Sequence, residues 1–365
     1  MMSRKNAIKG LISNVAIGLA VSQAAYGAAT IWDGTSTIKI NGSDVVVKKL
    51  TSDGVPYYGS GGSAAFPPGV SYTHTPSAKS YTYYIPVTPA LAGTSAAPKY
   101  TPVGLSNDFG VALDGVPFDP LTSYCGTDSA RSTVNTCSYR VEARLQTDPK
   151  TKTSAYTAKR LGFDVHNGHS QSDGAYHYHG ITCGIVTTSG GSSAFTCDPT
   201  STADATPFAH ISKTTIVGFA RDGYPIIVQG GIFASYAVVT AAGSGRPTVT
   251  GYTSLGNFSM DMSRLVSSGT TFTMPTSKTF ADFTYTGPSG YGTSTSALGL
   301  CNEAANTNPA ITLLDGKTMA AYAYYLTPNF PMIPRCLIGV ADGSTGSPTN
   351  NQGFYHTVVA FDGAE

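Results

Sequence analysis

Four of the seven histidines in the chain lie within 14 residues, at positions 166, 169, 177 and 179. His177 and His179 are two positions apart, in a segment that alternates tyrosine with histidine. In a β-strand, alternate side chains point to one face, about 6–7 Å apart at the backbone. Two imidazoles on one face can chelate a metal ion, and His169 from the preceding loop would add a third. Three histidines with an open fourth position suit a catalytic Zn²⁺ or a Cu site.

Asp164 and His166 are the remaining candidates near this set. Each could be a further ligand, or could orient a ligand histidine through its other ring nitrogen. The alternative interpretation is that the histidines hydrogen-bond a buried turn, while Tyr176 and Tyr178 pack on the opposite face. Four histidines in one short segment favour metal binding over this alternative. Imidazole sets bind Cu²⁺ most tightly, so copper is favoured slightly over zinc.

The elements that must position these residues are expected to be strands. An Asp-Gly pair at 173–174 predicts the turn that leads into the strand 176–179. Charged residues make up only 12% of the chain, too few for many solvent-facing helices. We therefore expect a mostly β protein, a large antiparallel β-sandwich or barrel-like fold with long loops and little helix. Only 130–145 and 259–266 have patterns that suggest short helices.

Two pairs of related segments suggest an internal repeat. Residues 110–117, Gly-Val-Ala-Leu-Asp-Gly-Val-Pro, resemble residues 218–225, Gly-Phe-Ala-Arg-Asp-Gly-Tyr-Pro. Each has an apolar strand, an Asp-Gly turn and a proline. Further along the chain, the tyrosine-rich segment 174–179 resembles 320–325.

This repeated order predicts two related halves, 101–200 and 208–340; chance recurrence of such turns in a β protein is the alternative. Both would lie in a main domain, 101–365, preceded by an N-terminal β segment, 29–100, that packs on the core. The second copy has no histidine where His177 and His179 would be. We therefore expect one metal site per chain.

Residues 1–28 resemble a secretory signal peptide, which is removed from the mature protein. Three basic residues flank the start of an apolar stretch, 11–25, that is rich in small side chains. The stretch is shorter than the about 20 apolar residues of a membrane span, and a single N-terminal anchor is the less favoured alternative. We expect a periplasmic or extracellular protein with no membrane contact after cleavage.

The mature chain would carry a net charge of −2, because three of the 22 basic residues and none of the 21 acidic residues precede residue 29. Its basic residues are scattered. This balance gives no electrostatic footprint for nucleic acid, and we expect no such partner. The sequence does not identify a protein or glycan partner.

Six cysteines lie beyond the leader, and an even number in an exported chain predicts disulfides. Their spacing leaves 15 possible pairings open. Local pairing is our preferred interpretation. It joins Cys125 to Cys137, Cys183 to Cys197, and Cys301 to Cys336. A cysteine metal site is disfavoured because no Cys-x-x-Cys spacing occurs.

The histidine segment resembles the YHYH family, named for the tetrapeptide found here at 176–179. The resemblance continues, in the family's order, over about residues 45–340. Its blocks are 51–56, 110–117, 161–164, 167–169, 174–179, 218–225, Cys301-Asn302 and 327–339, the last with Pro331, Pro334, Arg335 and Cys336.

Membership would imply an exported protein and specifies no reaction. It also implies that certain residues belong to the shared pattern, whereas His166 departs from it, since an asparagine-like residue is expected there. The implied residues are His169, His177, His179, Asp114, Asp164, Asp222 and Gly223.

The leading hypothesis is an exported metal-binding protein, and whether the metal serves catalysis is open. An open coordination position would allow water activation or oxidation, with Asp164 as a base. One alternative is a non-catalytic surface or adhesion protein, which the Ser/Thr/Gly-rich loops would suit. Another is a metal-independent hydrolase, although no Gly-x-Ser-x-Gly elbow occurs. The substrate is not identified.

Overall fold

The computed structural model of the protein is mostly β, as predicted. Within the residues that it describes, one short helix occurs, α2 (Cys183–Thr188). The segments 130–145 and 259–266, for which the sequence predicts short helices, lie outside the described residues. The described residues are 31–56, 74–103, 108–120, 163–164, 166–188, 214–239, 248–249, 272–273 and 282–341.

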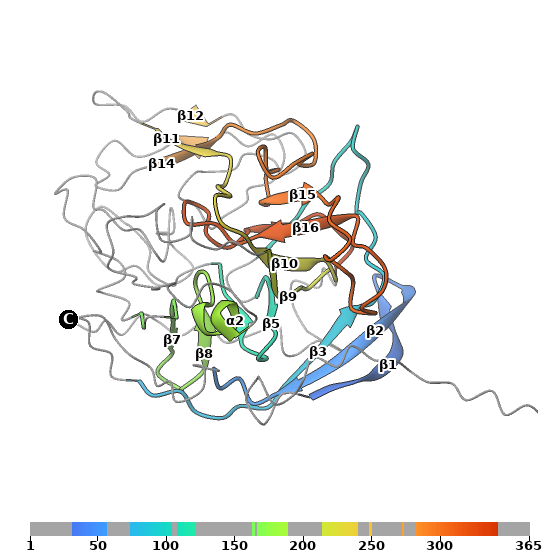
Figure 1. Cartoon of the computed structure of the whole chain (residues 1–365), viewed down its shortest axis with the longest axis vertical. Coiled ribbons are helices and arrows are strands. Elements are labelled where there is room, and N and C mark those ends of the chain that lie inside the picture. Colours follow the sequence, from blue (N-terminus) through green and yellow to red (C-terminus); the bar gives the residue numbers. More distant parts are fainter. Residues whose placement is uncertain are drawn as a thin grey trace, which may run out of the picture.

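The N-terminal part forms an antiparallel sheet of β1 (Ile31–Ile40), β2 (Ser43–Ser52) and β3 (Tyr81–Pro86). β1 and β2 are joined at Asn41 and Gly42, both with positive φ, as a type I′ hairpin turn requires. The sheet is drawn in blue along one side of the molecule (Figure 1). Buried apolar side chains of β2 and β3 belong to the main hydrophobic cluster that also contains side chains of the larger sheet.

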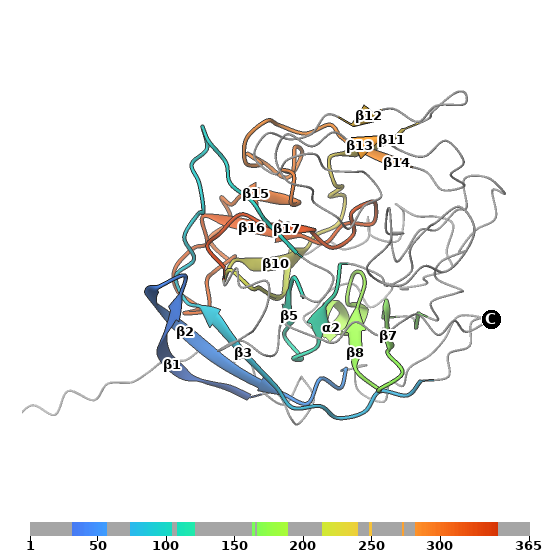
Figure 2. The same ribbon diagram turned by 180° about the vertical axis from the view of Figure 1, so that it is seen from behind.

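The larger sheet has eight strands in the order β15-β16-β10-β9-β5-β6-β8-β7. Figure 2 shows its strands from behind, with β7 at one end and β15 at the other. The strands are β5 (Gly110–Ala112), β6 (Pro117–Phe118), β7 (Gly168–Ser170), β8 (Tyr176–Tyr178), β9 (Thr215–Ala220), β10 (Pro225–Val228), β15 (Glu303–Ala305) and β16 (Tyr322–Tyr325).

This sheet differs from the expected antiparallel barrel-like arrangement in two respects. It is open, with β15 and β7 at its edges, and the described strands form no closed barrel. Two of its neighbouring pairs, β6 with β8 and β10 with β16, are parallel. Parallel neighbours need long connections, and each pair here joins a hairpin to a strand far along the chain.

Three further pairs complete the described strands. They are β4 (Thr101–Pro102) with β17 (Cys336–Leu337), β11 (Tyr236–Val239) with β14 (Asp282–Tyr285), and β12 (Thr248–Val249) with β13 (Phe272–Thr273). No helix among the described residues is long and apolar enough to cross a membrane.

One predicted disulfide is confirmed: Cys301 is bonded to Cys336, 35 positions away. The bridge ties β17 to the loop that leads into β15. The predicted pairs Cys125–Cys137 and Cys183–Cys197 lie outside the side chains that the structure describes. Loop closure of this length stabilises a folded chain by several kcal/mol, on the order of 3–4, in the chain-entropy treatment.

The eight-stranded sheet has an internal two-fold pattern. Its centre is the antiparallel pair β5 and β9, in which Val111 faces Phe219. From this centre, each side continues with a hairpin partner, then a parallel tyrosine-rich strand, then an antiparallel edge strand. The order on one side is β5-β6-β8-β7 and on the other β9-β10-β16-β15, so the two sides have the same connectivity.

Two buried aspartates make equivalent hydrogen bonds on the two sides of the eight-stranded sheet. In the first Asp-Gly turn, Asp114 Oδ2 accepts a 2.7 Å hydrogen bond from the Tyr178 hydroxyl, and Oδ1 accepts one from the Val116 amide. In the second turn, Asp222 Oδ2 accepts a 2.5 Å hydrogen bond from the Tyr324 hydroxyl. The glycine of each turn has a positive φ, 83° and 93°. The turn-and-strand units that the sequence pairs therefore share one geometry.

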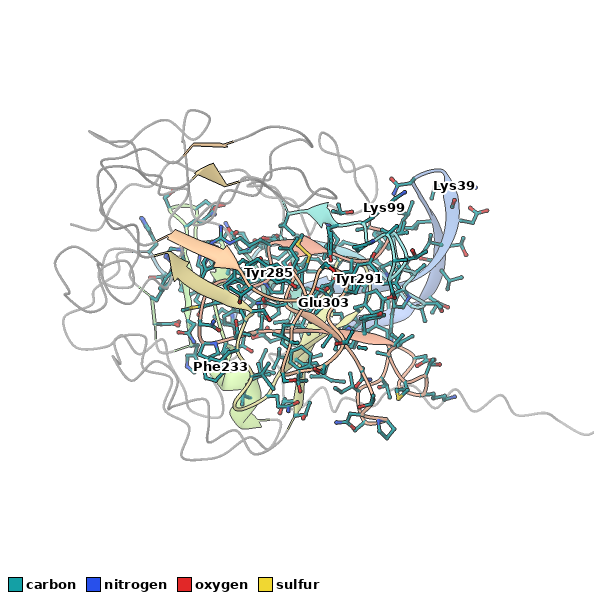
Figure 3. All side chains as sticks on the ribbon, turned by 90° about the horizontal axis from the view of Figure 1, so that it is seen from above. Lys39, Lys99, Phe233, Tyr285, Tyr291 and Glu303 are labelled. Atoms are coloured by element: carbon teal, nitrogen blue, oxygen red, sulfur yellow. A yellow bond between two sulfur atoms is a disulfide. The ribbon has the colours of Figure 1, made fainter. Side chains whose placement is uncertain are left out.

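Glu303, on β15, is a fully buried carboxyl in the second side of the sheet. Figure 3 shows it among the side chains of the interior, whereas Lys39 lies at the periphery. Its two oxygens accept hydrogen bonds from the amides of Gly292, 3.1 Å, and Cys301, 2.9 Å. Burial raises the pKa of Glu303 to about 7, although these hydrogen bonds act in the opposite direction.

We expect Glu303 to make the stability of the protein depend on pH. Its folded-state pKa lies above the ordinary value of 4.5, so the folded state holds the proton more tightly. Its contribution to stability is therefore present below about pH 4.5 and lost as the pH rises through 7. Urea unfolding at pH 5 and pH 8 should show a decrease of about 1–3 kcal/mol that Glu303→Gln reduces.

The matched control is Asp44→Asn, which changes an exposed carboxylate on β2. This variant should keep the wild-type difference between the two pH values. If Glu303→Gln also kept the full difference, the assignment of the pH dependence to Glu303 would be wrong.

Candidate metal centre

A β-hairpin positions the first two histidines. β7 and β8 pair antiparallel, and His169 lies directly opposite His177. The Asp-Gly turn predicted at 173–174 is present, with a φ of 82° at Gly174. The sequence places His169 on a loop, whereas the structure places it on β7. The difference arises because β7 has only three residues, too few for the alternation of polar and apolar residues that marks a strand.

The three histidine rings converge on one point. His177 and His179 lie on the same side of the strand, as predicted, with ring centroids 4.6 Å apart. The His169 ring lies 4.7 Å from His177 and 5.0 Å from His179. One ring nitrogen from each residue can be chosen so that all three lie within 4.8 Å of one another. Among the described residues, this is the cluster whose geometry could hold a metal ion.

The cluster is shielded from solvent. His169, His177 and His179 are 9%, 6% and 2% exposed. The Phe163 ring packs against two of them, 4.9 Å from His169 and 5.1 Å from His179. The Nε2 atoms of His169 and His177 are 3.0 Å apart, within hydrogen-bond distance when one of them carries a proton. A bound cation would therefore interact with these nitrogens in a medium of low dielectric constant.

Asn167 holds the backbone of the third histidine, His179, in place. Its carbonyl oxygen accepts a 2.8 Å hydrogen bond from the His179 amide, and its side-chain amide donates to the Ile181 carbonyl at 2.7 Å. Asn167 has a φ of 65°, a left-handed conformation that asparagine tolerates better than most residues. This role of Asn167 was not predicted from the sequence, although the Asn-Gly pair at 167–168 is a pattern that predicts such a conformation.

Asp164 is close to the cluster, but its hydrogen bonds stabilise the loop before β7. Its Oδ1 accepts hydrogen bonds from the amides of His166, 2.8 Å, and Gly168, 3.2 Å. Its Oδ2 accepts one from the Tyr176 hydroxyl, 2.7 Å. Burial raises the pKa of Asp164 to about 6, against the effect of these hydrogen bonds. With both oxygens engaged, Asp164 shapes the loop before β7 and lies outside the three-histidine group.

His166 also lies outside this group. Its side chain is half-buried, and this burial lowers its pKa to about 4, which keeps the ring neutral at physiological pH. Of the isolated histidines, His74 is described and does not belong to the group. His210 and His356 lie outside the described residues.

The other side of the sheet repeats this geometry without histidines. β15 pairs with β16 so that Ala304 faces Ala323, as His169 faces His177. The amide of Tyr325 donates to the carbonyl of Asn302 at 2.9 Å, as the amide of His179 donates to Asn167. Asn302 has the same left-handed conformation, with a φ of 53°. His169, His177 and His179 therefore correspond to Ala304, Ala323 and Tyr325.

These counterparts are part of a buried apolar cluster. Leu298, which corresponds to Phe163, belongs to the same cluster. The same backbone arrangement is therefore stable with two alanines and a tyrosine in place of the three histidines. Because burying polar groups has a cost that apolar residues avoid, the imidazoles are not needed to build this unit.

We expect Gly168→Ala to destabilise the hairpin. A Cβ at this position would lie 2.3 Å from the Tyr176 hydroxyl and 2.7 Å from the His177 carbonyl oxygen. Because the carbonyl belongs to the backbone of β8, β7 must shift away from it. The free energy of unfolding, measured with urea, should decrease by about 1–3 kcal/mol.

Gly34→Ala is the control, because a Cβ at Gly34 meets nothing within 4 Å. Its effect should be within about 0.5 kcal/mol of zero, as for most exposed positions. Equal effects of the two substitutions would show that β7 and β8 are not in close contact at Gly168.

Comparison with known proteins places the chain in one family. The sequence model of the family described as YHYH protein matches residues 82–339. The match includes the Asp-Gly turns at 114–115, 173–174 and 222–223 and the three clustered histidines, but it begins after the segment 51–56, which resembles the family's first block. No curated protein and no solved structure matches the chain. The match covers most of the sequence, and the chain therefore belongs to the YHYH protein family.

Proposed function

We propose that this protein is exported and binds one copper or zinc ion through His169, His177 and His179. The observation that carries the proposal is the convergence of three ring nitrogens within 4.8 Å of one another. In a three-histidine site with metal–nitrogen bonds of about 2.0–2.1 Å, ligand nitrogens are separated by about 3.3 Å. The 3.0 Å between the Nε2 atoms of His169 and His177 is close to this separation.

The rigidity of the surroundings supports the proposal. Two of the imidazoles come from paired strands, and the third is hydrogen-bonded through its backbone to Asn167. Side chains held in this way need little reorganisation on binding a metal ion, so less binding energy is spent on ordering them. The apolar counterparts of the three histidines in the second half support a functional reason for the imidazoles.

The ligand chemistry favours copper slightly over zinc. Three neutral imidazoles suit both metals, and a site made of nitrogen ligands binds Cu²⁺ more tightly than Zn²⁺. An imidazole set also leaves at least one coordination position for water or a substrate. The proposal therefore extends to a metalloenzyme, whose substrate the sequence and the structure do not identify. Both oxygens of Asp164, the base that the sequence suggests, accept hydrogen bonds, from two loop amides and from the Tyr176 hydroxyl.

Export is supported by two features. The N-terminal segment has the composition of a secretory signal peptide. The disulfide between Cys301 and Cys336 is of a kind typical of proteins in oxidising compartments such as the periplasm and the exterior.

A direct test is the N-terminal sequence of the secreted protein, which should begin between residues 25 and 30.

Metal content tests the proposed site. Protein purified without a histidine tag should contain about one copper or zinc ion per chain by elemental analysis. The triple variant His169→Ala, His177→Ala, His179→Tyr should contain none, because it replaces the ligands with the residues of the second half. Since those residues already pack in the same backbone geometry, we expect this variant to fold.

The control is His74→Ala, which removes a histidine outside the group. It should keep the metal. A wild-type protein that takes up no copper or zinc, or a folded triple variant with unaltered metal content, would exclude the proposed site.

A further inference from the structure

The strand that pairs in parallel with the tyrosine-rich strand provides a further position at which the two halves can be compared. In the second half, β10 pairs with β16, and Ile227 lies opposite Tyr325. Ile227 is fully buried in the apolar cluster with Ala304 and Ala323. This neighbour of Tyr325 is therefore part of the lining that replaces the histidines.

Asp119 occupies the corresponding position in the first half. β6 pairs with β8 through Phe118 and Tyr178, as β10 pairs with β16 through Ile226 and Tyr324. The next residue continues the ladder, because the Asp119 amide donates to the Tyr178 carbonyl at 3.0 Å.

The side chains of a strand alternate between the two faces of the sheet, and this alternation determines the face on which Asp119 lies. The rings of Phe118 and Tyr178 share one face and lie 5.8 Å apart. The following residues, Asp119 and His179, belong to the opposite face. This is the face of the three histidines, and Asp119 is only 4% exposed.

We propose that Asp119 is a positioning residue of the metal site, a buried carboxylate that acts on the bound ion through His179. The inference rests on the proposed metal-binding function. A carboxylate that accepts a hydrogen bond from the second ring nitrogen of a metal-bound histidine fixes the orientation of the ring and raises its basicity. The oxygens of Asp119 are not among the atoms that lie within 4.8 Å of one another, so Asp119 is outside the ligand set.

The contrast between Asp119 and Ile227 supports this role. A buried carboxylate is costly, and an isoleucine occupies the same position in the second half. An aspartate at this position is therefore not a requirement of the sheet. A bound divalent cation beside three neutral imidazoles would give the carboxylate a favourable electrostatic interaction in a medium of low dielectric constant.

The test compares Asp119→Asn and Asp119→Ile with the wild type in the full mature chain. Competition with a chelator measures the affinity for Cu²⁺ and, separately, for Zn²⁺. Both variants should still bind one ion per chain through three imidazoles, but 10- to 100-fold more weakly. The asparagine keeps a hydrogen-bond acceptor without the charge, so its loss should be smaller than that of the isoleucine.

Electron paramagnetic resonance of the Cu²⁺ forms gives a readout that a purely structural role would not change. The nitrogen couplings of three imidazoles should persist in both variants, with a shifted copper signal. The matched control is Asp44→Asn, which removes an exposed carboxylate on β2. This variant should bind Cu²⁺ like the wild type. If Asp119→Ile does not fold, the same measurements on Asp119→Asn decide.

The outcomes separate the two proposals. Wild-type affinity in Asp119→Asn and Asp119→Ile, with metal lost in the triple histidine variant, would overturn the role of Asp119 and leave the site intact. Complete loss of metal in a folded Asp119→Asn would make Asp119 a ligand and also overturn the positioning role. If the wild type binds neither Cu²⁺ nor Zn²⁺, both proposals fail.

Discussion

Two buried aspartates, Asp114 and Asp222, hold the large sheet together at equivalent points. Each caps its own Asp-Gly turn and accepts a hydrogen bond from a tyrosine, Tyr178 or Tyr324, on the neighbouring parallel strand. A carboxylate removed from water must be hydrogen-bonded. The bond between aspartate and tyrosine therefore holds the turn and the tyrosine-rich strand in one relative position. In the first half, that constraint also sets the position of His177 and His179, which flank the bonded tyrosine.

The two halves show how one backbone arrangement can support two different interiors. In the second half, the corresponding positions hold two alanines and a tyrosine, which are buried in a cluster with aliphatic side chains. In the first half, three imidazoles occupy the corresponding positions, with Phe163 packed beside them. The buried carboxylates also lie at different positions in the two halves. Asp164 accepts hydrogen bonds from the amides of His166 and Gly168. Glu303, which lies on β15 itself, accepts one from the amide of Cys301 in the loop before that strand. The shared elements are the backbone turns, and the differing elements are the side chains that give the first half its chemistry.

Much of the local structure could be predicted from the sequence. The low charge and the abundance of Thr and Tyr indicated a β protein, and the Asp-Gly pairs marked turns that the structure contains. The disulfide between Cys301 and Cys336 was predicted from proximity in the sequence. The parallel pairing of β6 with β8 was not predicted, since it joins short strands far apart in the chain. Strands of two or three residues carry too little pattern to specify a partner.

The sequence alone predicts that His177 and His179 share a face, because the period of a strand is two. It also predicts the Asp-Gly turn that reverses the chain before them. The tertiary pairing was needed to show that His169 lies opposite His177, that the Tyr176 hydroxyl reaches Asp164, and that Asp119 follows the ladder beside His179. These relations depend on which strands pair and in which register. That choice follows from burial and hydrogen bonding summed over the whole sheet, and no single segment contains it.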